Sequence, residues 1–251
     1  MARMIAVTGK GGVGKTTVAA LVVKYLKDNT PGPILALDAD PDANLAAVLG
    51  IEVESTIGDL REDMLKRIRD FPAGMSKESY FEAGLHELIT ETAKVDLITM
   101  GRGEGPGCYC FINNLLRKFA DDLLPSYAWA VMDNEAGLEH ISRRTASFID
   151  HLIVVVSDSP LAVDCARRID KLLADLDRSV RNRHYVLNAV PDSRVEAVMQ
   201  RMSELRFEHL ATIPRDDALA EAVFNGQSVY MLDNTPAVRT IADMMRQIGA
   251  G

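Results

Sequence analysis

The stretch Gly9-Lys10-Gly11-Gly12-Val13-Gly14-Lys15-Thr16-Thr17 decides how the rest of this sequence is interpreted. It fits the pattern G-x-x-x-x-G-K-[ST] at full length, and it directly follows the apolar run 4–8. The residues after it carry apolar positions at helical spacing, so the context is strand, loop and helix. Glycines in such a loop let backbone N–H groups converge on phosphate oxygens, and the helix start adds positive potential. The stretch therefore predicts a phosphate-binding loop.

Two side chains of this loop have specific expected roles. Lys15 is expected to reach the β and γ phosphates of a nucleotide, and Thr16 to present its hydroxyl to Mg²⁺. The candidate nucleotide-binding residues of the loop are Gly9, Lys10, Gly11, Gly12, Val13, Gly14, Lys15, Thr16 and Thr17.

Short apolar runs recur along the whole chain, and most of them do not alternate with polar residues. They cover 4–8, 34–38, 95–100, 129–133, 152–157, 184–188 and 210–213. Helical patterns lie between most of them, over 16–27, 112–123, 161–176, 194–203 and 235–248. Continuous apolar strands are typical of a sheet that helices cover on both faces. We therefore expect an α/β fold with an open, doubly wound, mainly parallel sheet of about seven to eight strands.

Length and composition limit the possible classes of protein. At 251 residues the chain suits one domain spanning 1–251, within which 51–94 is expected to be a mostly helical, more mobile insertion. The formal net charge of -8 disfavours a nucleic-acid partner. No apolar run approaches the length of a membrane span, and three cysteines indicate no disulfide framework. We expect a cytoplasmic protein without a membrane or nucleic-acid partner.

Carboxylates follow two of the predicted strands. Asp38 and Asp40 lie at the end of 34–38, and Asp133 ends 129–133. Each alone fits a helix N-cap or a solvated turn. Their joint position at strand C-terminal ends, where open α/β sheets bind ligands, favours a ligand site instead.

A glycine-rich loop carries the pair Cys108 and Cys110. In an extended segment residues i and i+2 project to the same side, so both sulfurs could bind one ion. Two thiolates are half of a tetrahedral site, and a symmetric dimer would supply the other half. Taken alone, the pair fits reduced, buried or redox-active thiols equally well. Cys165, on a predicted helix, is expected to pack as a small hydrophobe.

Lys10, the D-x-E-A-G segment 133–137 and the C-x-C pair together resemble one family. The loop resembles the deviant Walker A of the MinD, ParA and nitrogenase-iron-protein ATPases, and the combination looks like the CooC-type accessory ATPases that mature nickel-containing carbon monoxide dehydrogenase. The resemblance covers nearly the whole chain, except that 51–94 carries no usable motif. It implies an ATP-hydrolysing homodimer in which Lys10 contacts phosphates bound by the other subunit. The alternative for Lys10 is a solvated loop lysine.

The resemblance also implies roles for the residues at the strand ends. Asp40 would orient or activate the attacking water, and Asp38 would lie near Mg²⁺. Asp133 would hold Mg²⁺ through water, and Gly137 would let the backbone sense the γ-phosphate of ATP.

Base recognition is assigned in the same way. Asn188, Pro214 and Arg215 are similar to adenine-contacting positions of this group, and the guanine-specific N-K-x-D signature is missing after Asn188. Asn188 as a plain turn former at a strand end is the alternative.

The implied function is ATP-dependent delivery or insertion of nickel into carbon monoxide dehydrogenase or a related nickel enzyme, with Cys108 and Cys110 holding Ni²⁺ or Zn²⁺ across the dimer. A competing hypothesis is a MinD- or ParA-like switch whose ATP and ADP states time association with a partner, DNA or a membrane. A third is an iron–sulfur reductase component, although the 135–137 segment lacks the cysteine that nitrogenase-type iron proteins would place there.

Overall fold

The computed structural model describes residues 2–66, 77–101, 122–135, 149–175 and 180–250. Within them, seven strands form one parallel sheet in the order β3-β2-β4-β1-β5-β6-β7. The strands are β1 (Arg3–Gly9), β2 (Ile34–Ala39), β3 (Val95–Thr99), β4 (Trp129–Asn134), β5 (Ile149–Val156), β6 (Val180–Asn188) and β7 (Glu208–Ile213). The predicted α/β fold class is confirmed.

The first strand lies in the middle of this sheet. β1 pairs with β4 on one side and with β5 on the other, so that Ile5 lies opposite Val131 and His151. Residues 4–8 of β1 are all buried. Because helices cover both faces, its side chains need no polar alternation, which explains the continuous apolar run in the sequence.

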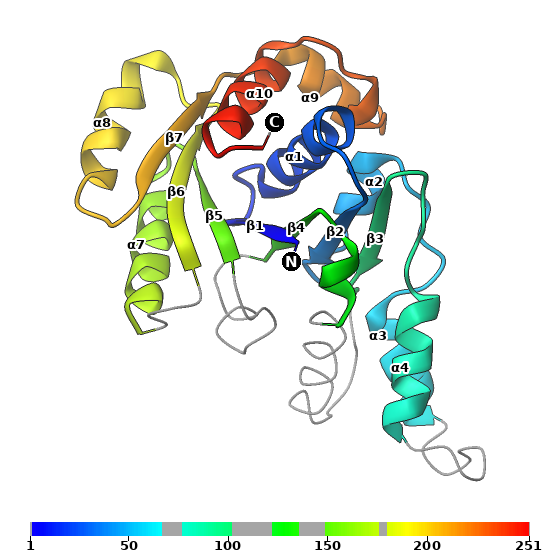
Figure 1. Cartoon of the computed structure of the whole chain (residues 1–251). Helices are drawn as coiled ribbons and strands as arrows, with labels where there is room; N and C mark the ends of the chain where they lie inside the picture. Colours follow the sequence, from blue (N-terminus) through cyan, green and yellow to red (C-terminus); the bar gives the residue numbers. More distant parts are fainter. Residues whose placement is uncertain (1, 67–76, 102–121, 136–148, 176–179, 251) are drawn as a thin grey trace.

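Helices cover the two faces of the sheet. Helices α1 (Lys15–Asn29) and α10 (Pro236–Gln247) pack against each other on one side, and α7 (Pro160–Asp175) and α8 (Asp192–Met202) lie together on the other (Figure 1). A shorter helix, α9 (Asp217–Phe224), follows β7. None of the described helices is both long and apolar enough to cross a bilayer.

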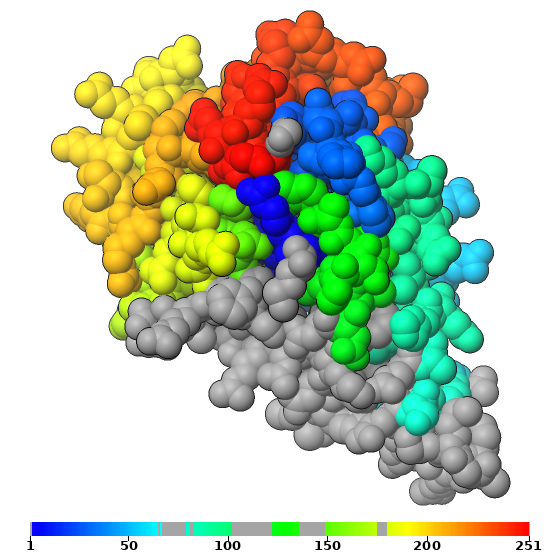
Figure 2. All heavy atoms as spheres, in the orientation of Figure 1, coloured from blue at the N-terminus to red at the C-terminus, as the bar shows by residue number. Residues whose placement is uncertain are grey.

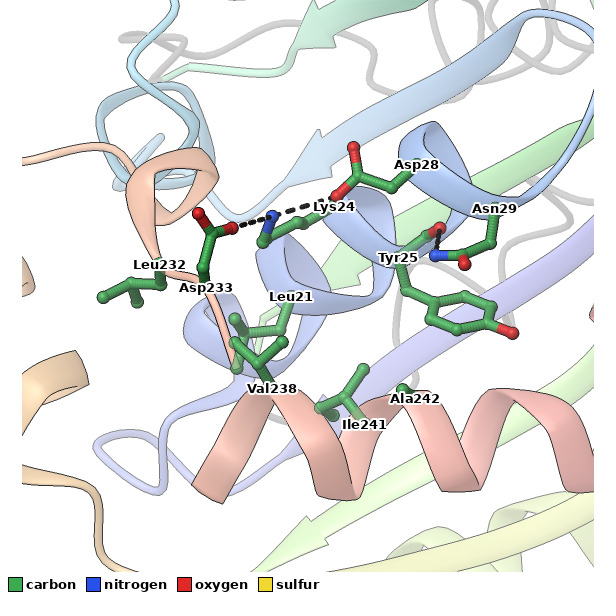
Figure 3. A pocket seen from close by; sticks show the side chains of 10 residues that line it. All are labelled: Leu21, Lys24, Tyr25, Asp28, Asn29, Leu232, Asp233, Val238, Ile241 and Ala242. Carbon is green, nitrogen blue, oxygen red and sulfur yellow. Dashed lines mark hydrogen bonds and ion pairs between the residues drawn. The ribbon is translucent and has the colours of Figure 1, made fainter. Parts of the chain in front are cut away.

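A small cavity of about 170 Å³ lies between α1 and α10 (Figure 3). At its rim the Lys24 ammonium lies 2.9 Å from a carboxylate oxygen of Asp28 and 3.9 Å from one of Asp233. The apolar side of the cavity includes Leu21 and Ile241. Lys24 is buried, so these ion pairs satisfy a charge that would otherwise be costly to bury.

The predicted boundaries differ from the observed ones in places. β5 and β6 begin before the predicted 152 and 184, because polar residues such as Asp150 and Asn182 begin these strands and hide their starts from an apolar pattern. α9 was not expected at all. In the 51–94 region the described residues are mainly helical, with α3 (Ile57–Lys66) and α4 (Lys77–Glu87). The preceding α2 (Leu45–Leu49) is short. Most of the predicted helix 112–123 lies outside the described residues.

Arg3 ties the two ends of the described chain together. Its guanidinium donates hydrogen bonds to the backbone oxygens of Gly249 at 2.7 Å and Ile248 at 3.0 Å. It also lies 4.3 Å from the centre of the Trp129 ring. Figure 2 shows the red C-terminal atoms directly beside the blue atoms of β1. The last helix is thus fastened to the central strand of the sheet.

Candidate functional site

The candidate site lies where the carboxyl ends of β1, β2 and β4 meet. Register pairs Asp133 of β4 with Asp38 of β2 and with Val7 of β1. The glycine-rich loop begins at Gly9, the last residue of β1. Residues that were predicted separately as a phosphate loop and as strand-end carboxylates therefore lie at one edge of the sheet.

The loop needs glycine at two positions, because each has a positive φ and a Cβ there would clash with a neighbouring strand residue. Gly9 has φ +149°, and a Cβ there would lie 2.4 Å from the carbonyl oxygen of Val155 on β5. Gly14 has φ +90°, and a Cβ there would lie 2.4 Å from Asn188 Nδ2. At Gly11, by contrast, an added Cβ would meet nothing within 4 Å. The loop is thus closely packed against β5 and β6 at its two ends and open in its middle.

Helix α1 begins immediately after this loop. Gly14 is its N-cap residue and offers no side chain to cap the first backbone N–H groups. These groups are therefore available for an anion, and the helix dipole favours negative charge there. Lys15 is buried and Thr16 half-buried at this helix start. An uncapped helix start with a buried lysine is an arrangement that suits a phosphate group.

Asp38 and Asp40 are held by local backbone hydrogen bonds. Asp38 Oδ1 accepts from the N–H of Asp40 at 3.2 Å, and its Oδ2 accepts from the N–H of Leu45 at 2.9 Å, at the start of α2. Asp40 Oδ1 accepts from the N–H of Asp42 at 3.0 Å. Burial raises the pKa of Asp38 to about 6, although the two backbone hydrogen bonds oppose that shift.

Asp133 is the least satisfied side chain of the site. It is completely buried, and both of its carboxylate oxygens lack a hydrogen-bond partner within the described residues. Burial raises its pKa to about 7. Nearby Asp38 and Asp40 add to this shift, while the Thr16 hydroxyl and the Lys15 ammonium oppose it. Thr16 acts here as a polar neighbour whose geometry falls short of a hydrogen bond.

A buried carboxylate without partners is costly, and a divalent cation is the group that would satisfy it. The donors around it fit Mg²⁺, which prefers hard oxygen ligands and one or two carboxylates. Asp133 and the Thr16 hydroxyl supply such oxygens beside the loop. The residues present are therefore chemically suited to a magnesium–nucleotide complex.

Two further polar residues lie at this edge and were not singled out from the sequence. Thr99 pairs with Asp38 across β3 and β2, and its hydroxyl is buried without a hydrogen bond among the described residues. Asn134 donates from Nδ2 to the carbonyl oxygen of Val7 at 3.1 Å, while its Oδ1 is buried and unpartnered there. Both residues end an apolar strand, β3 and β4 respectively, and this position is the signal in the sequence from which they could have been predicted as site residues.

A pocket of about 580 Å³ lies beside the loop, between α1 and α9. It is lined by Thr17, Val18, Leu21, Asn188, Ala189, Ile213, Pro214, Arg215, Asp216, Leu219, Ala220, Val223 and Phe224. The three residues predicted to contact adenine, namely Asn188, Pro214 and Arg215, thus share one pocket with the predicted loop residue Thr17. Its mixture of apolar walls and a few polar groups is typical of a pocket for a flat heterocycle.

The orientation of the Asn188 amide is set by the phosphate loop. Its Nδ2 donates to the carbonyl oxygen of Val13 at 2.8 Å. A flipped amide would place two oxygens against each other, so this contact fixes which end of the amide is Oδ1. Oδ1 and the second N–H of Nδ2 remain for a ligand. The residue therefore presents a hydrogen-bond acceptor beside the pocket.

Several predicted site residues are not tested by this geometry. Cys108, Cys110 and Gly137 lie outside the described residues. Lys10 is half-buried in the loop. Cys165 is buried on α7, as expected of a small hydrophobe. Within the described residues no group of three or more metal-ligating side chains occurs.

A glycine-rich loop between a central strand and the next helix, with carboxylates at neighbouring strand ends, defines the class of P-loop nucleotide-binding proteins. Residues 4–229 match the CobQ/CobB/MinD/ParA nucleotide binding domain, and the chain belongs to that family.

Two relatives cover nearly the same length as this chain. It is 39% identical over 248 residues to the uncharacterized ATP-binding protein MJ0685 of Methanocaldococcus jannaschii, covering 98% of each chain. It is 30% identical over 251 residues to the carbon monoxide dehydrogenase accessory protein CooC of Rhodospirillum rubrum, covering 94% of this chain and 91% of that protein.

The fold is also similar to that of a solved structure, the septum site-determining protein MinD of Pyrococcus horikoshii complexed with Mg-ADP. The TM-score is 0.70 at 21% identity, covering 99% of this chain and 96% of that chain. At this level of identity the similarity concerns the fold.

Proposed function

We propose that this protein is a Mg²⁺-dependent ATPase. The observation that carries the proposal is the completely buried, unpartnered Asp133 carboxylate beside Thr16 and Lys15 of the loop, among the described residues. The fold family is one of nucleotide-binding domains. Bound Mg²⁺ would neutralise phosphate charge and align the β and γ phosphates of ATP.

The residues of this chain then have distinct roles. The loop backbone and the start of α1 cradle the phosphates, and the Lys15 ammonium balances their negative charge. Asp133 and the Thr16 hydroxyl hold the cation. Asp38 has both oxygens engaged by backbone N–H groups, so its role is to fix the 38–45 segment. Asp40 engages one oxygen in the described part of the chain and orients the attacking water with the other.

Adenine is favoured over guanine by the polarity of Asn188. The free Oδ1 accepts a hydrogen bond from the exocyclic amino group of adenine, whereas it would face the carbonyl oxygen of guanine at the same position. An unpaired or repulsive polar contact in a pocket reduces affinity strongly. The amide is held in this orientation by the loop that binds the phosphates, so base and phosphate recognition share one hydrogen bond.

Phosphate release from ATP and GTP, each with Mg²⁺ and with chelator, tests this part of the proposal. We expect hydrolysis with ATP and Mg²⁺, less with GTP, and none with chelator. Equal rates with and without Mg²⁺ would contradict the role given to Asp133.

We further propose that ATP turnover serves nickel delivery to carbon monoxide dehydrogenase or a related nickel enzyme. The support is the 30% identity to CooC over 94% of this chain, together with the Cys108 and Cys110 pair in the sequence. Two cysteines from each subunit of a homodimer would bind one Ni²⁺ or Zn²⁺ ion, because four thiolates complete a tetrahedral site.

Anaerobic binding of Ni²⁺ and Zn²⁺, with ATP or ADP present, tests this finer function. We expect about one metal ion per dimer, lost in the double variant Cys108→Ser with Cys110→Ser and retained in Cys165→Ser. Cys165 is the matched control because it is a buried cysteine on α7 and is not part of the C-x-C pair. Binding that does not exceed the double variant's background would overturn nickel handling and leave the ATPase proposal standing.

A second candidate function is a MinD-like switch whose ATP and ADP states time association with a partner or a membrane. The similarity of the fold to MinD with Mg-ADP favours it. Co-sedimentation with anionic liposomes or DNA in ATP, and not in ADP, would support this alternative. Binding of about one metal ion per dimer, without co-sedimentation with liposomes or DNA, would instead support the maturation function.

A further inference from the structure

The base pocket has two walls that belong to different parts of the chain. One wall comes from α1 and includes Thr17, Val18 and Leu21, and the other comes from α9. α10 packs against α1. The distance between the two pocket walls therefore depends on how α9 is fixed relative to α10.

Asp216 lies where these two helices begin. Its Oδ1 accepts from the N–H of Leu219 at 3.1 Å, in the first turn of α9. Its Oδ2 accepts from the N–H of Ala237 at 2.9 Å, in the first turn of α10. The residue is buried and also lines the pocket. Asp216 is thus the N-cap of α9, and it also accepts a hydrogen bond from the first turn of α10, whose own N-cap is Thr235.

We infer that Asp216 is a positioning residue that sets the width of the base pocket by fastening the start of α9 to the start of α10. Both of its oxygens are engaged by backbone donors, so it acts through the pocket wall and not on the ligand directly. The inference rests on the proposed binding of ATP. It adds a determinant of base affinity that lies outside the phosphate loop.

The charge of Asp216 and the position of its neighbours agree with this role. Burial alone would raise the pKa of Asp216, but hydrogen bonds from Thr235, Ala237 and Leu219 hold it below its ordinary value. The carboxylate is thus ionised at neutral pH, and charged acceptors make the stronger caps. The neighbouring Pro214 and Arg215 also line the pocket, so movement of Asp216 would move them with it.

The test compares two ligands on the full chain. The dissociation constants of ATP and of inorganic tripolyphosphate, both with Mg²⁺, are measured by titration calorimetry for the wild type, Asp216→Ala and Asp216→Asn. The affinity for tripolyphosphate depends on the phosphate loop alone, whereas the affinity for ATP also depends on the base pocket. Thr56→Ala serves as the matched control, because the Thr56 hydroxyl accepts from the N–H of Asp59 at 3.2 Å and so caps α3 instead.

We expect Asp216→Ala to bind ATP about tenfold more weakly, from the loss of hydrogen bonds to a charged group. In Asp216→Ala the affinity for tripolyphosphate should change less than about twofold, because this substitution does not reach the phosphate loop. In Thr56→Ala the affinities for ATP and for tripolyphosphate should both change less than about twofold. Asp216→Asn keeps one acceptor oxygen, so its affinity for ATP should lie between the affinities of the wild type and of Asp216→Ala. If Asp216→Ala does not fold, the comparison is made with Asp216→Asn alone.

Three results would count against the inference in different ways. Equal weakening of ATP and tripolyphosphate would show a general loss of structure. Unchanged ATP binding in both variants would show that pocket width does not depend on Asp216. Wild-type protein that binds tripolyphosphate and ATP equally would overturn the proposed recognition of the base, whatever the variants do.

Discussion

At the scale of single residues, Asp133 lowers the stability of the fold while serving the proposed binding of a cation. Its burial removes the water that would solvate its charge, and its neighbours Asp38 and Asp40 repel it. Apolar residues would pack more favourably at this position on β4. Retaining a carboxylate here is reasonable if a cation satisfies it in the working protein.

Asp133→Asn should therefore separate stability from activity. At pH 8 without Mg²⁺, we expect the free energy of unfolding in urea to rise by about 1 kcal/mol or more, because an unpaired buried charge is removed. Mg²⁺-dependent ATP hydrolysis should fall roughly 100-fold, since the cation loses a carboxylate ligand.

Asp150→Asn is the matched control for this substitution. Asp150 lies at the amino end of β5, where its carboxylate accepts from the backbone N–H of Met4 at 2.9 Å. This variant should not gain stability and should keep the wild-type rate of hydrolysis. A stability gain in both variants would remove the argument from Asp133.

The contrast between the tightly packed Gly9 and the open Gly11 leads to a second prediction. Gly9→Ala places a methyl group 2.4 Å from a backbone oxygen of Val155, so β1 or β5 must shift. We expect a loss of about 3 kcal/mol or more in the free energy of unfolding. Gly11→Ala meets nothing within 4 Å, and its stability should change by less than about 0.5 kcal/mol. Urea unfolding of both proteins, followed by circular dichroism, provides the comparison.

At the scale of secondary-structure elements, β5 and β6 place two buried histidines side by side. His151 Nδ1 lies 3.2 Å from His184 Nε2, and the rings are stacked with their centres 5.4 Å apart. Burial lowers the pKa of His151 to about 4 and also lowers the pKa of His184. The charged groups around the pair are Arg3 on β1, Asp150 on β5, Arg181 on β6 and Glu208 on β7.

This pair should make the fold sensitive to mild acid. The unfolded chain binds protons near pH 6.5, while the folded chain keeps both rings neutral, so stability is lost as pH falls from about 6.5 toward about 4. Between pH 7 and pH 5 we expect the histidine pair to lower the free energy of unfolding by on the order of 2 kcal/mol. The raised pKa values of Asp38 and Asp133 act in the opposite direction over the same range, because the folded chain there binds protons that the unfolded chain does not.

The variant His151→Gln should lack this contribution, so its free energy of unfolding relative to the wild type should increase as pH falls from 7 to 5. His86→Gln, on the exposed surface of α4, should retain the wild-type slope. Urea unfolding at half-unit steps of pH measures both slopes. An unchanged slope in His151→Gln would assign the acid sensitivity to other groups.

The sequence predicted the elements that depend on local patterns and missed those that depend on strand order. The loop 9–17 and the strand-end carboxylates were predictable because each is encoded in a short contiguous segment. The His151–His184 contact was not, since it requires β5 and β6 to be neighbours in a known register. The same holds for Asn188 against Val13, and for Asp216 between α9 and α10. Short α9 escaped prediction because one helical turn or two carry little periodicity.

At the scale of the whole molecule, the proposed homodimer depends on Lys10. If this side chain contacts phosphates bound by the other subunit, Lys10→Ala should weaken ATP-dependent dimerisation at least about tenfold, because charge-assisted contacts of this kind are strong. Light scattering after size-exclusion chromatography, with a non-hydrolysable ATP analogue, measures the effect. Lys171→Ala, on an exposed position of α7, should dimerise like the wild type. Normal dimerisation of Lys10→Ala would leave Lys10 a solvated loop lysine.

The central place of β1 also determines when, during synthesis, the middle of the sheet can begin to form. β1 precedes both of its sheet partners in the chain, since β4 and β5 lie within residues 129–156. Until those residues emerge, the apolar strand and its glycine loop have no neighbours to pair with, and nucleotide cannot help to hold them. The hydrogen bonds of Arg3 form later still, because the carbonyl groups that accept them belong to residues 248 and 249. While residues 10–128 are being synthesised, this apolar strand therefore stays unpaired and exposed to aggregation.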